Sequence, residues 1–237
     1  MIPKDVMQKS LNKFQFYSRI QFQILSAKEQ KFLAKHSANI ALKRKRILFK
    51  QDSKPSGVYM IVKGKVKVYQ LNYDGSIQIL FIYGAGETFG FRPLIGHQLQ
   101  PMSVAALEDS EIVFIERKAF MDVLEDSNPL LHQLLVNMCH EFSVFTNRMN
   151  IYAQRNIKER LALSLLLLND KFKLPGDAFG KSEIKMDRTD LANYVGTSLE
   201  NLVRTLSYYK SKRMIKIKGK SIFIEDYENL YIHSAIG

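Results

Sequence analysis

The sequence predicts an α+β protein: an N-terminal β-roll (a double-stranded, jelly-roll-like barrel), a long dimerisation helix and a C-terminal winged helix-turn-helix. Three observations lead to this prediction. Residues 47–116 form short strand-like runs punctuated by glycine, residues 131–152 carry a heptad of large apolar side chains, and residues 186–209 read as two short helices around one tight turn. We place the boundaries of the three parts at residues 1–126, 127–155 and 156–237.

The chain begins with helical and irregular sequence that leads into the first strands. Residues 1–40 mix basic and apolar side chains, and Ser26 with Glu29 three residues later has the spacing of a capping box. The basic cluster at residues 43–46 is followed directly by a strand-like run. We interpret this cluster as a solvated loop, with a nucleic-acid patch as the alternative.

Short runs rich in β-branched and aromatic residues predict the strands of the roll. Residues 58–62, 65–71 and 76–83 are such runs. Asp74 and Gly75 lie between the last two runs and predict a hairpin with a type I′ turn, which needs positive φ at both central positions. Many short strands with frequent glycine turns are typical of a small sandwich or jelly-roll barrel.

Asn128 and Pro129 predict the start of the longest helix, with an N-cap followed by proline at the first helical position. Large apolar residues then recur at alternating steps of four and three, which favours a symmetric dimer seam. A single helix packed on its own barrel is the alternative. Cys139 lies beside the seam, and we expect it to be a small buried apolar residue. The seam residues are Leu131, Leu135, Met138, Phe142, Phe145, Met149 and Tyr152.

The C-terminal part contains a further helix and a strand pair besides the two short helices. Residues 156–169 read as a helix, with Ile157, Leu161 and Leu165 on its buried stripe, and residues 173–180 read as a loop. Two alternating strands around Gly219 read as the wing of a winged helix, at residues 214–218 and 221–225. Lys216, Lys218 and Lys220 on this wing suit phosphate contacts; a plain solvated hairpin is the alternative.

Local sequence signals predict the two helices of the helix-turn-helix. Asp187 and Asp190 have the spacing of a capping box at the first helix. Gly196 can take the left-handed conformation that ends this helix. Thr197 or Ser198 is a suitable N-cap for the second helix.

The second helix is amphipathic, and its polar face carries groups that suit base edges. Leu199, Leu202, Leu206 and Tyr209 fall on one face, which we expect to pack into a small core. The opposite face carries Glu200, Arg204, Ser207 and Ser211. Arginine donates two hydrogen bonds to guanine, and glutamate accepts from the cytosine amino group in the major groove. A surface ion pair between the carboxylate and the guanidinium, worth a few tenths of a kcal/mol, is the alternative.

Composition places the chain among soluble proteins with a polyanionic partner. Apolar residues make up 46% and charged residues 24% of the 237 positions, and the formal net charge is +12. The sequence shows no apolar run long enough to span a bilayer and no signal peptide. Cys139 is the single cysteine, so an internal disulfide is excluded. We therefore expect cytoplasmic localisation without membrane association.

The motif of residues 193–206, Asn-Tyr-Val-Gly-Thr-Ser-Leu-Glu-Asn-Leu-Val-Arg-Thr-Leu, resembles the helix-turn-helix of the Crp/Fnr transcription regulators. The resemblance implies that Glu200 and Arg204 read an operator half-site. It also implies a homodimer on an inverted repeat and contact with RNA polymerase. Leu199 stands where the cyclic-AMP-receptor branch has a base-reading arginine, so the pattern is closer to the fumarate–nitrate branch. The further candidate DNA contacts are Val203, Ser198, Thr197, Asn201, Arg188, Lys218 and Lys220.

Residues 58–68 and 84–90 resemble the strands and the phosphate-cassette approach of the cyclic-nucleotide-binding β-roll. The cassette itself departs from the family pattern. Phe91 and Arg92 replace the usual Glu and Leu, and Met102 precedes Ser103 where an arginine grips the cyclic phosphate. Cyclic-nucleotide binding is therefore disfavoured. The degenerate pocket comprises Gly90, Phe91, Arg92, Met102 and Ser103.

Other cofactors and enzymatic activity are also disfavoured. One cysteine cannot supply the four thiolates of an iron–sulfur cluster. We interpret His97 as an exposed loop residue and not as a haem ligand. His132 and His140 have no third ligand at a spacing that suits zinc. We find no nucleophile–base set, and expect no enzyme.

The best account of the sequence is a homodimeric transcription regulator with two recognition helices roughly 34 Å apart on an inverted repeat. An unidentified effector at the roll, or none, controls it. The alternative is a cyclic-nucleotide-responsive signalling module that does not bind DNA. That alternative leaves Glu200, Arg204 and the lysine wing unexplained.

Overall fold

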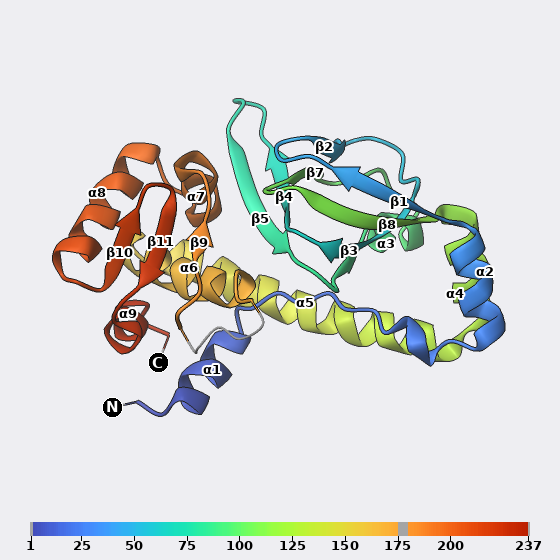
Figure 1. Cartoon of the computed structure of the whole chain (residues 1–237), viewed down its shortest axis with the longest axis horizontal. Coiled ribbons are helices and arrows are strands. Elements are labelled where there is room, and N and C mark those ends of the chain that lie inside the picture. Colours follow the sequence, from blue (N-terminus) through green and yellow to red (C-terminus); the bar gives the residue numbers. More distant parts are fainter. Residues whose placement is uncertain (1, 175–179, 237) are drawn as a thin grey trace. The chain divides into compact units, whose positions relative to one another are not determined.

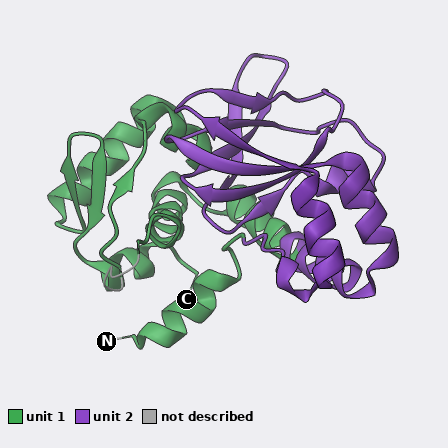
Figure 2. Ribbon diagram, turned by 45° about the vertical axis from the view of Figure 1, so that its right-hand side comes forward, with its two compact units in different colours: residues 1–16, 143–237 green, residues 17–142 purple. Residues whose placement is uncertain are grey.

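The computed structural model describes residues 2–174 and 180–236. The chain forms two compact units (Figure 2). Residues 17–142 form one, here called the roll unit. Residues 1–16 and 143–237 form the other, here called the winged unit. The division falls inside the long helix, after residue 142, and the N-terminal segment joins the C-terminal unit; our predicted boundaries lie elsewhere.

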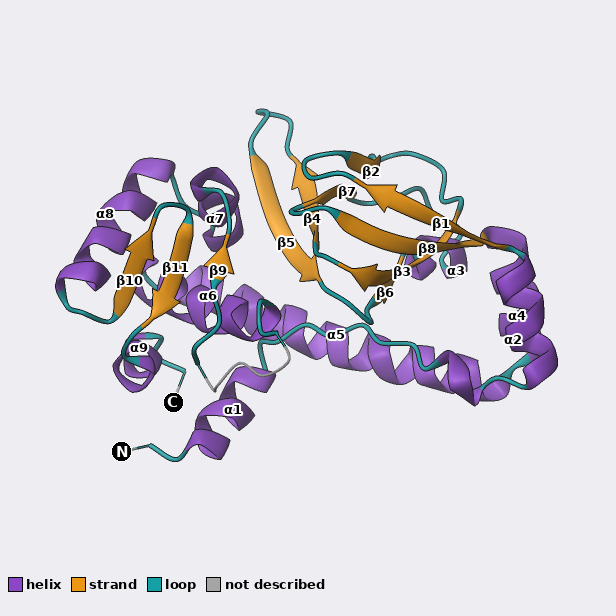
Figure 3. Cartoon of the chain, in the orientation of Figure 1, coloured by secondary structure: helices purple, strands orange, loops and turns teal. Residues whose placement is uncertain are grey.

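The roll unit contains two four-stranded antiparallel sheets, coloured orange in Figure 3. The sheets are open and do not close into a barrel, which corrects the barrel part of the predicted fold class. In order across the first sheet lie β1 (Ser37–Leu42), β8 (Ser110–Glu116), β3 (Gly57–Lys63) and β6 (Thr88–Phe89). The second sheet has β2 (Ile47–Phe49), β7 (Ser103–Ala106), β4 (Val66–Leu71) and β5 (Ile77–Tyr83).

Aromatic side chains from both sheets fill the interior of the roll. Tyr59 of β3 lies against Phe49 of β2, with ring centroids 5.4 Å apart. Phe89 of β6 stacks on Tyr83 of β5 at 5.1 Å. Each large ring buries apolar area and brings further stabilisation from ring–ring contact, so these pairs join the two sheets.

The β4–β5 hairpin confirms the predicted turn position but not the turn type. The Gly75 N–H donates to the Asn72 carbonyl at 3.0 Å, and Gly75 has φ of 80°. Asp74 does not have positive φ. The turn is therefore not type I′, and one left-handed glycine closes a longer loop between Leu71 and Ile77.

Helices cover the ends of the roll. The Ser26–Glu29 capping box is present at the start of α2 (Ala27–Lys35), and α2 lies beside α4 (Arg117–Asp126) in Figure 1. The basic residues 43–46 form the predicted loop before β2, where Lys43 pairs with Asp109 at 2.7 Å. A single turn of 3₁₀ helix (Phe22–Ile24) and the short α3 (Phe91–Ile95) complete this unit.

The long helix α5 (Asn128–Gln154) runs from the roll unit into the winged unit. It begins one residue before the predicted start, because the Leu131 N–H bonds to the Ser127 carbonyl at 3.0 Å. One face is buried in the chain's own units and contains Leu130, Leu134, Glu141, Val144, Arg148 and Ile151.

The winged unit contains the predicted helices and strand pair, together with elements that sequence reasoning missed. The expected elements are α6 (Ile157–Lys171), α7 (Arg188–Val195), α8 (Leu199–Ser211), β10 (Ile215–Lys218) and β11 (Ser221–Ile224). The missed ones are β9 (Ile184–Lys185) and α9 (Tyr227–His233), whereas α1 (Lys4–Asn12) lies in the stretch that we read as helical and irregular. β9 extends the wing to a three-stranded sheet in the order β10–β11–β9 (Figure 1). Residues 175–179 of the predicted loop lie outside the described residues.

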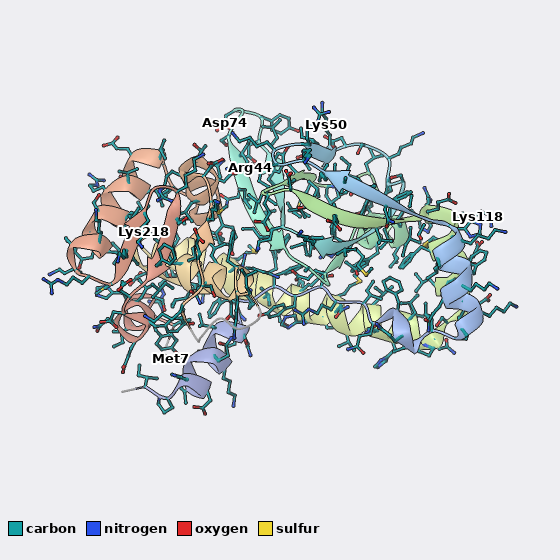
Figure 4. All side chains as sticks on the ribbon, in the orientation of Figure 1. Met7, Arg44, Lys50, Asp74, Lys118 and Lys218 are labelled. Atoms are coloured by element: carbon teal, nitrogen blue, oxygen red, sulfur yellow. The ribbon has the colours of Figure 1, made fainter. Side chains whose placement is uncertain are left out.

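The N-terminal helix packs on the winged unit by its apolar face. Met7 of α1, labelled in Figure 4, and Leu11 of the same helix are buried. Gln8 donates to the Asp170 carboxylate at 3.0 Å, and the Ile2 N–H donates to Glu228 at 2.7 Å. Among the described residues, the structure has no helix long and apolar enough to cross a membrane.

Candidate nucleic-acid interface

The turn between α7 and α8 forms as its residue types predict. Gly196 has φ of 71° and its N–H bonds to the Ala192 carbonyl at 2.9 Å, which ends α7. Ser198 caps α8, since its hydroxyl accepts from the Asn201 N–H at 3.2 Å. The predicted capping box at α7 is absent: Asp187 is at the N-cap position, but its carboxylate accepts from Lys220 instead.

α8 is held in place by its buried stripe. Leu202, Leu206 and Tyr209 are almost fully buried, and the Tyr209 hydroxyl donates to the Lys158 carbonyl at 2.7 Å. Leu199 does not share this stripe, contrary to our prediction, because its side chain is 47% exposed. As the first residue of α8, it lies directly after the turn, where nothing in the unit covers it.

The opposite face of α8 is open to solvent. Glu200, Val203, Arg204 and Ser207 are exposed there. Arg204 donates to the Asn201 side-chain oxygen, one turn back on the same helix. Within the residues the structure describes, Glu200 has no hydrogen bond or ion pair, so the alternative of a Glu200–Arg204 surface ion pair is not formed. Both charged groups are therefore available to a ligand.

The wing presents lysines beside this helix pair, as the sequence predicts. Lys216 and Lys218 are exposed on β10, and the Lys218 ammonium lies 5.9 Å from the Phe223 ring centroid (Figure 4). Lys220 is also largely exposed, but it pairs with Asp187 at 2.8 Å. Lys218 is thus the less constrained of the two candidate phosphate contacts.

Two of the predicted DNA contacts, Arg188 and Thr197, have side-chain polar groups that are bonded or buried within the winged unit. Arg188 donates to the carbonyls of Gly219 at 3.2 Å and Lys220 at 3.0 Å, and burial lowers the pKa of its guanidinium. This side chain therefore supports the wing turn. The Thr197 hydroxyl is buried and has no hydrogen-bond partner among the described atoms, so it does not face outward.

A cluster that sequence reasoning missed attaches α7 to the preceding helices. Arg148 of α5 donates to the Tyr194 hydroxyl at 3.0 Å, and the Tyr152 hydroxyl donates to the Tyr194 carbonyl at 3.0 Å. Arg160 of α6 donates to the Gly196 carbonyl, also at 3.0 Å. Sequence reasoning missed it because Arg148 interrupts the apolar pattern on the buried face of α5.

The predicted seam on α5 is a face distinct from the buried one. Leu131, Leu135, Met138, Phe142, Phe145 and Met149 are each more than 40% exposed. Tyr152 differs from these six, because it is half-buried and bonded to α7. Cys139 is exposed, whereas we predicted that it would be buried.

The degenerate pocket of the roll is a cavity of about 190 Å³. Gly90, with φ of 92°, begins α3; a side chain there would lie 2.9 Å from the Gly57 carbonyl. Phe91 is buried in the core, and the Ser103 hydroxyl accepts from the Gln51 N–H at 2.9 Å. Met102 and Arg92 line the cavity.

Arg92 is engaged inside the roll unit. Its Nε donates to the Glu141 carboxylate of α5 at 2.6 Å, and its Nη2 donates to the Tyr83 hydroxyl at 3.0 Å. Burial raises the pKa of Glu141, and Arg92 opposes that shift. The cavity is also smaller than the roughly 300–1,000 Å³ of typical ligand pockets.

Metal-ligating side chains do not gather in the part of the chain that the structure describes. His97 and His132 are both exposed, on a loop and on α5. Exposed charged groups, among them Glu200, Arg204 and Lys218, lie on α8 and the wing. A wing next to an outward-facing Glu–Arg helix defines a DNA-binding protein of the winged helix-turn-helix class.

Comparisons with known proteins identify the family. Residues 40–127 match the cyclic nucleotide-binding domain family, and residues 159–231 match the Crp-like helix-turn-helix domain family. The fumarate and nitrate reduction regulatory protein of Vibrio cholerae is 28% identical over 183 residues, which cover 77% of this chain and 73% of that protein. The protein of the same name from Escherichia coli K12 is 28% identical over 189 residues, covering 80% and 75%.

Solved structures agree on the fold. FixK2 from Bradyrhizobium japonicum has a TM-score of 0.75 at 20% identity, covering 84% of this chain and 98% of that one. The c-di-GMP-responsive global regulator CLP of Xanthomonas campestris has a TM-score of 0.71 at 18% identity, covering 84% and 99%. The chain belongs to the Crp/Fnr family of DNA-binding transcription regulators.

Proposed function

We propose that two copies of this chain bind an inverted-repeat promoter site and that Glu200 and Arg204 of each copy read the base edges of one half-site. One observation carries this proposal: both side chains lie on the exposed face of α8, and neither is paired with the other. The N-terminal part of a recognition helix is the part that contacts bases. Guanine and cytosine are the bases that arginine and glutamate recognise in the major groove.

The exposed face of α5 supports the homodimer. Six large apolar side chains follow one another along this helix, while a separate face is buried in the same chain. A contiguous exposed apolar stripe of this length marks an interaction surface. Because its period is that of a coiled coil, a second copy of the same helix is the partner we propose.

Lysines of the wing supply contacts that position the protein without reading sequence. Lys218 is exposed and free to reach a phosphate, and Lys216 lies two residues away on the same strand. The net charge of +12 favours association with DNA. We include contact with RNA polymerase at the promoter as part of the proposal, to be tested by transcription in vitro.

The roll carries either an effector other than a cyclic nucleotide or no effector. The engaged Arg92 and the small cavity support this choice. Calorimetry with cyclic AMP should therefore detect no binding. A micromolar site would favour the alternative, a cyclic-nucleotide-responsive module.

Selection of bound sequences from random DNA tests the proposed function, followed by Arg204→Ala on the selected site. We expect an inverted repeat with G·C pairs, and a loss of about 1–3 kcal/mol for the variant on that site with little change on random DNA. Lys218→Ala should weaken binding to both DNAs alike and reduce the salt dependence. Arg117→Ala, an exposed arginine of the roll unit, is the control. Equal losses on both DNAs for Arg204→Ala would contradict base reading.

A further inference from the structure

The first residues of the chain are anchored to the winged unit at several points. We call residues 2–16 the N-terminal strap. Met7 and Leu11 of its helix α1 are 4% and 1% exposed, and Asn147 of α5 donates to the Lys13 carbonyl at 2.9 Å. The strap lies outside both stretches of the chain that match a family. Its role must therefore be inferred from its own contacts.

Arg148 of α5 connects the strap to α7. Its Nε donates to the Phe14 carbonyl and its Nη2 donates to the Tyr194 hydroxyl, both at 3.0 Å. The guanidinium carbon also lies 5.6 Å from the Tyr194 ring centroid. A guanidinium is planar and presents its donors in a rigid fork, so the acceptor on Nε helps to determine where Nη2 points. The strap carbonyl thereby orients the group that holds Tyr194.

The burial of this guanidinium makes its acceptors important. Arg148 is 9% exposed. Burying a charge is costly unless the charge is hydrogen-bonded, and a hydrogen bond from a charged donor is stronger than a neutral one. If the strap detached, the Nε of Arg148 would have to turn toward water or another acceptor. Because the fork is rigid, this movement would disturb the bond to Tyr194.

Tyr194 fixes the C-terminal end of α7. It is 4% exposed, and its carbonyl accepts from the Tyr152 hydroxyl at 3.0 Å while its hydroxyl accepts from Arg148. Gly196, which ends α7, follows two residues later. In a helix-turn-helix the first helix crosses the DNA backbone and the second enters the groove. The position of Tyr194 therefore affects how both helices are presented.

We propose that the N-terminal strap is a positioning element of the DNA-binding unit: its Phe14 carbonyl orients Arg148, and Arg148 fixes α7 at Tyr194. The strap and Arg148 act through Tyr194 and not by contact with bases. This inference rests on the proposed function, because the helix-turn-helix is the part that the strap positions.

Two variants interrupt this connection at its two ends. Deletion of residues 2–12 removes the anchors of the strap, whereas Tyr194→Phe removes one hydroxyl and keeps the ring. Affinity is measured on the site selected from random DNA and on random DNA. We expect each variant to lower the ratio of specific to random affinity by about three- to tenfold, at or below the lower end of what a hydrogen bond to a charged group contributes. Val6→Ala, at a position of α1 that is 46% exposed, is the control and should keep the parent ratio.

Combining the two changes shows whether the strap acts through Tyr194. In the chain that lacks residues 2–12, Tyr194→Phe should lower the ratio little further, because the bond from Arg148 has already lost its orientation. Additive losses would mean that the strap stabilises the unit without acting on Tyr194. If circular dichroism shows that the deletion variant does not fold, Leu11→Ala loosens the strap in its place.

Hydrogen exchange tests the inference in the absence of DNA. The amides of α7 should exchange faster in the deletion variant and in Tyr194→Phe than in the parent protein or in Val6→Ala. The amides of β10 and β11 should exchange as in the parent protein. A strap that only adds overall stability would instead speed exchange throughout the unit.

The outcomes separate the inference from the proposed function. If the protein binds no duplex, the proposed function fails, and hydrogen exchange of α7 still decides whether the strap fixes this helix. If the protein binds a specific site and Arg204→Ala relaxes the specificity, the proposed function stands. An unchanged affinity ratio, additive losses in the combined variant, or unchanged exchange of α7 then overturns the inference alone.

Discussion

Arg92 shows how one side chain is used inside the roll unit. The family pattern has leucine at this position, and the arginine here forms an ion pair with Glu141 inside the roll unit. Glu141 is 7% exposed and Arg92 is 30% exposed at the side chain. The attraction of such a pair mainly offsets the free energy of removing two charges from water. The arginine therefore forms an ion pair in the interior of the roll unit.

Arg92→Leu should lower the free energy of unfolding by about 3 kcal/mol, the lower end of the range for breaking a buried pair, since Arg92 keeps some contact with water. Glu141 is then buried without its arginine partner. Burial raises its pKa, so the folded state binds the proton more tightly than the unfolded chain does. The free energy of unfolding of the variant should consequently increase as the pH falls through this raised pKa and decrease as the pH rises.

Urea unfolding at several pH values measures this effect. The double variant Arg92→Leu with Glu141→Leu should recover most of the loss at neutral pH, because no charge remains buried. Lys118→Leu, which breaks an exposed pair with Asp122, is the control and should change stability by less than about 1 kcal/mol. An unchanged midpoint for Arg92→Leu would show that the pair does not stabilise the roll.

At the scale of elements, local sequence signals correctly predicted α8 and the turn before it. They did not predict the tertiary contacts of the residues next to that helix and turn. Gly196 and Ser198 act through bonds within a few residues, which a sequence pattern can reveal. Leu199 was assigned to the packing face because periodicity cannot show that a helix end lies beyond its neighbours. Asp187 was assigned to a cap because its true partner, Lys220, is 33 residues away.

The long helix illustrates the same limit. Its heptad was visible because six large apolar residues recur without interruption. Its buried face could not be recognised in the sequence, because Glu141 and Arg148 interrupt the apolar pattern there. The N-terminal helix α1 could not be placed either, because Gln8 and Asp170 are 162 residues apart. Contacts across such separations depend on the whole fold.

Arg160 gives a prediction at this scale. Its guanidinium holds the Gly196 carbonyl in the turn that precedes α8, so Arg160→Ala should let this turn relax while the buried stripe of α8 keeps the unit folded. A hydrogen bond to a charged group stabilises a fold by about 1.5–3 kcal/mol, so its loss should reduce affinity for the specific site by at most that amount. Affinity for random DNA should change little. Arg155→Ala, an exposed arginine nearby in sequence, is the control.

The ratio of specific to random affinity is the measurement for Arg160. A variant that merely lost positive charge would weaken both DNAs equally. Arg160→Lys should restore part of the ratio, because an ammonium can still donate to the carbonyl. An unaltered ratio for Arg160→Ala would mean that the turn holds its shape without this bond.

At the scale of the whole molecule, the proposed function depends on two chains acting together. A single α8 offers few base contacts, whereas two linked half-sites multiply the effect of each contact through high effective concentration. The surface proposed for pairing is apolar and exposed in one chain, with Phe142 at its centre and 72% exposed. A helix of 27 residues gives this seam its length.

Phe142→Glu should therefore produce monomers, because it places two carboxylates opposite each other in an apolar seam. Asn150→Glu adds the same charge to α5 outside both the exposed stripe and the buried face, and should remain dimeric. Sedimentation velocity distinguishes the two states. The monomeric variant should also bind the inverted repeat no more tightly than it binds one isolated half-site, since effective concentration is lost. If Phe142→Glu sediments as the parent protein does, α5 does not form the dimer seam. If the variant is monomeric yet binds the full repeat as tightly as before, DNA reading does not need a dimer.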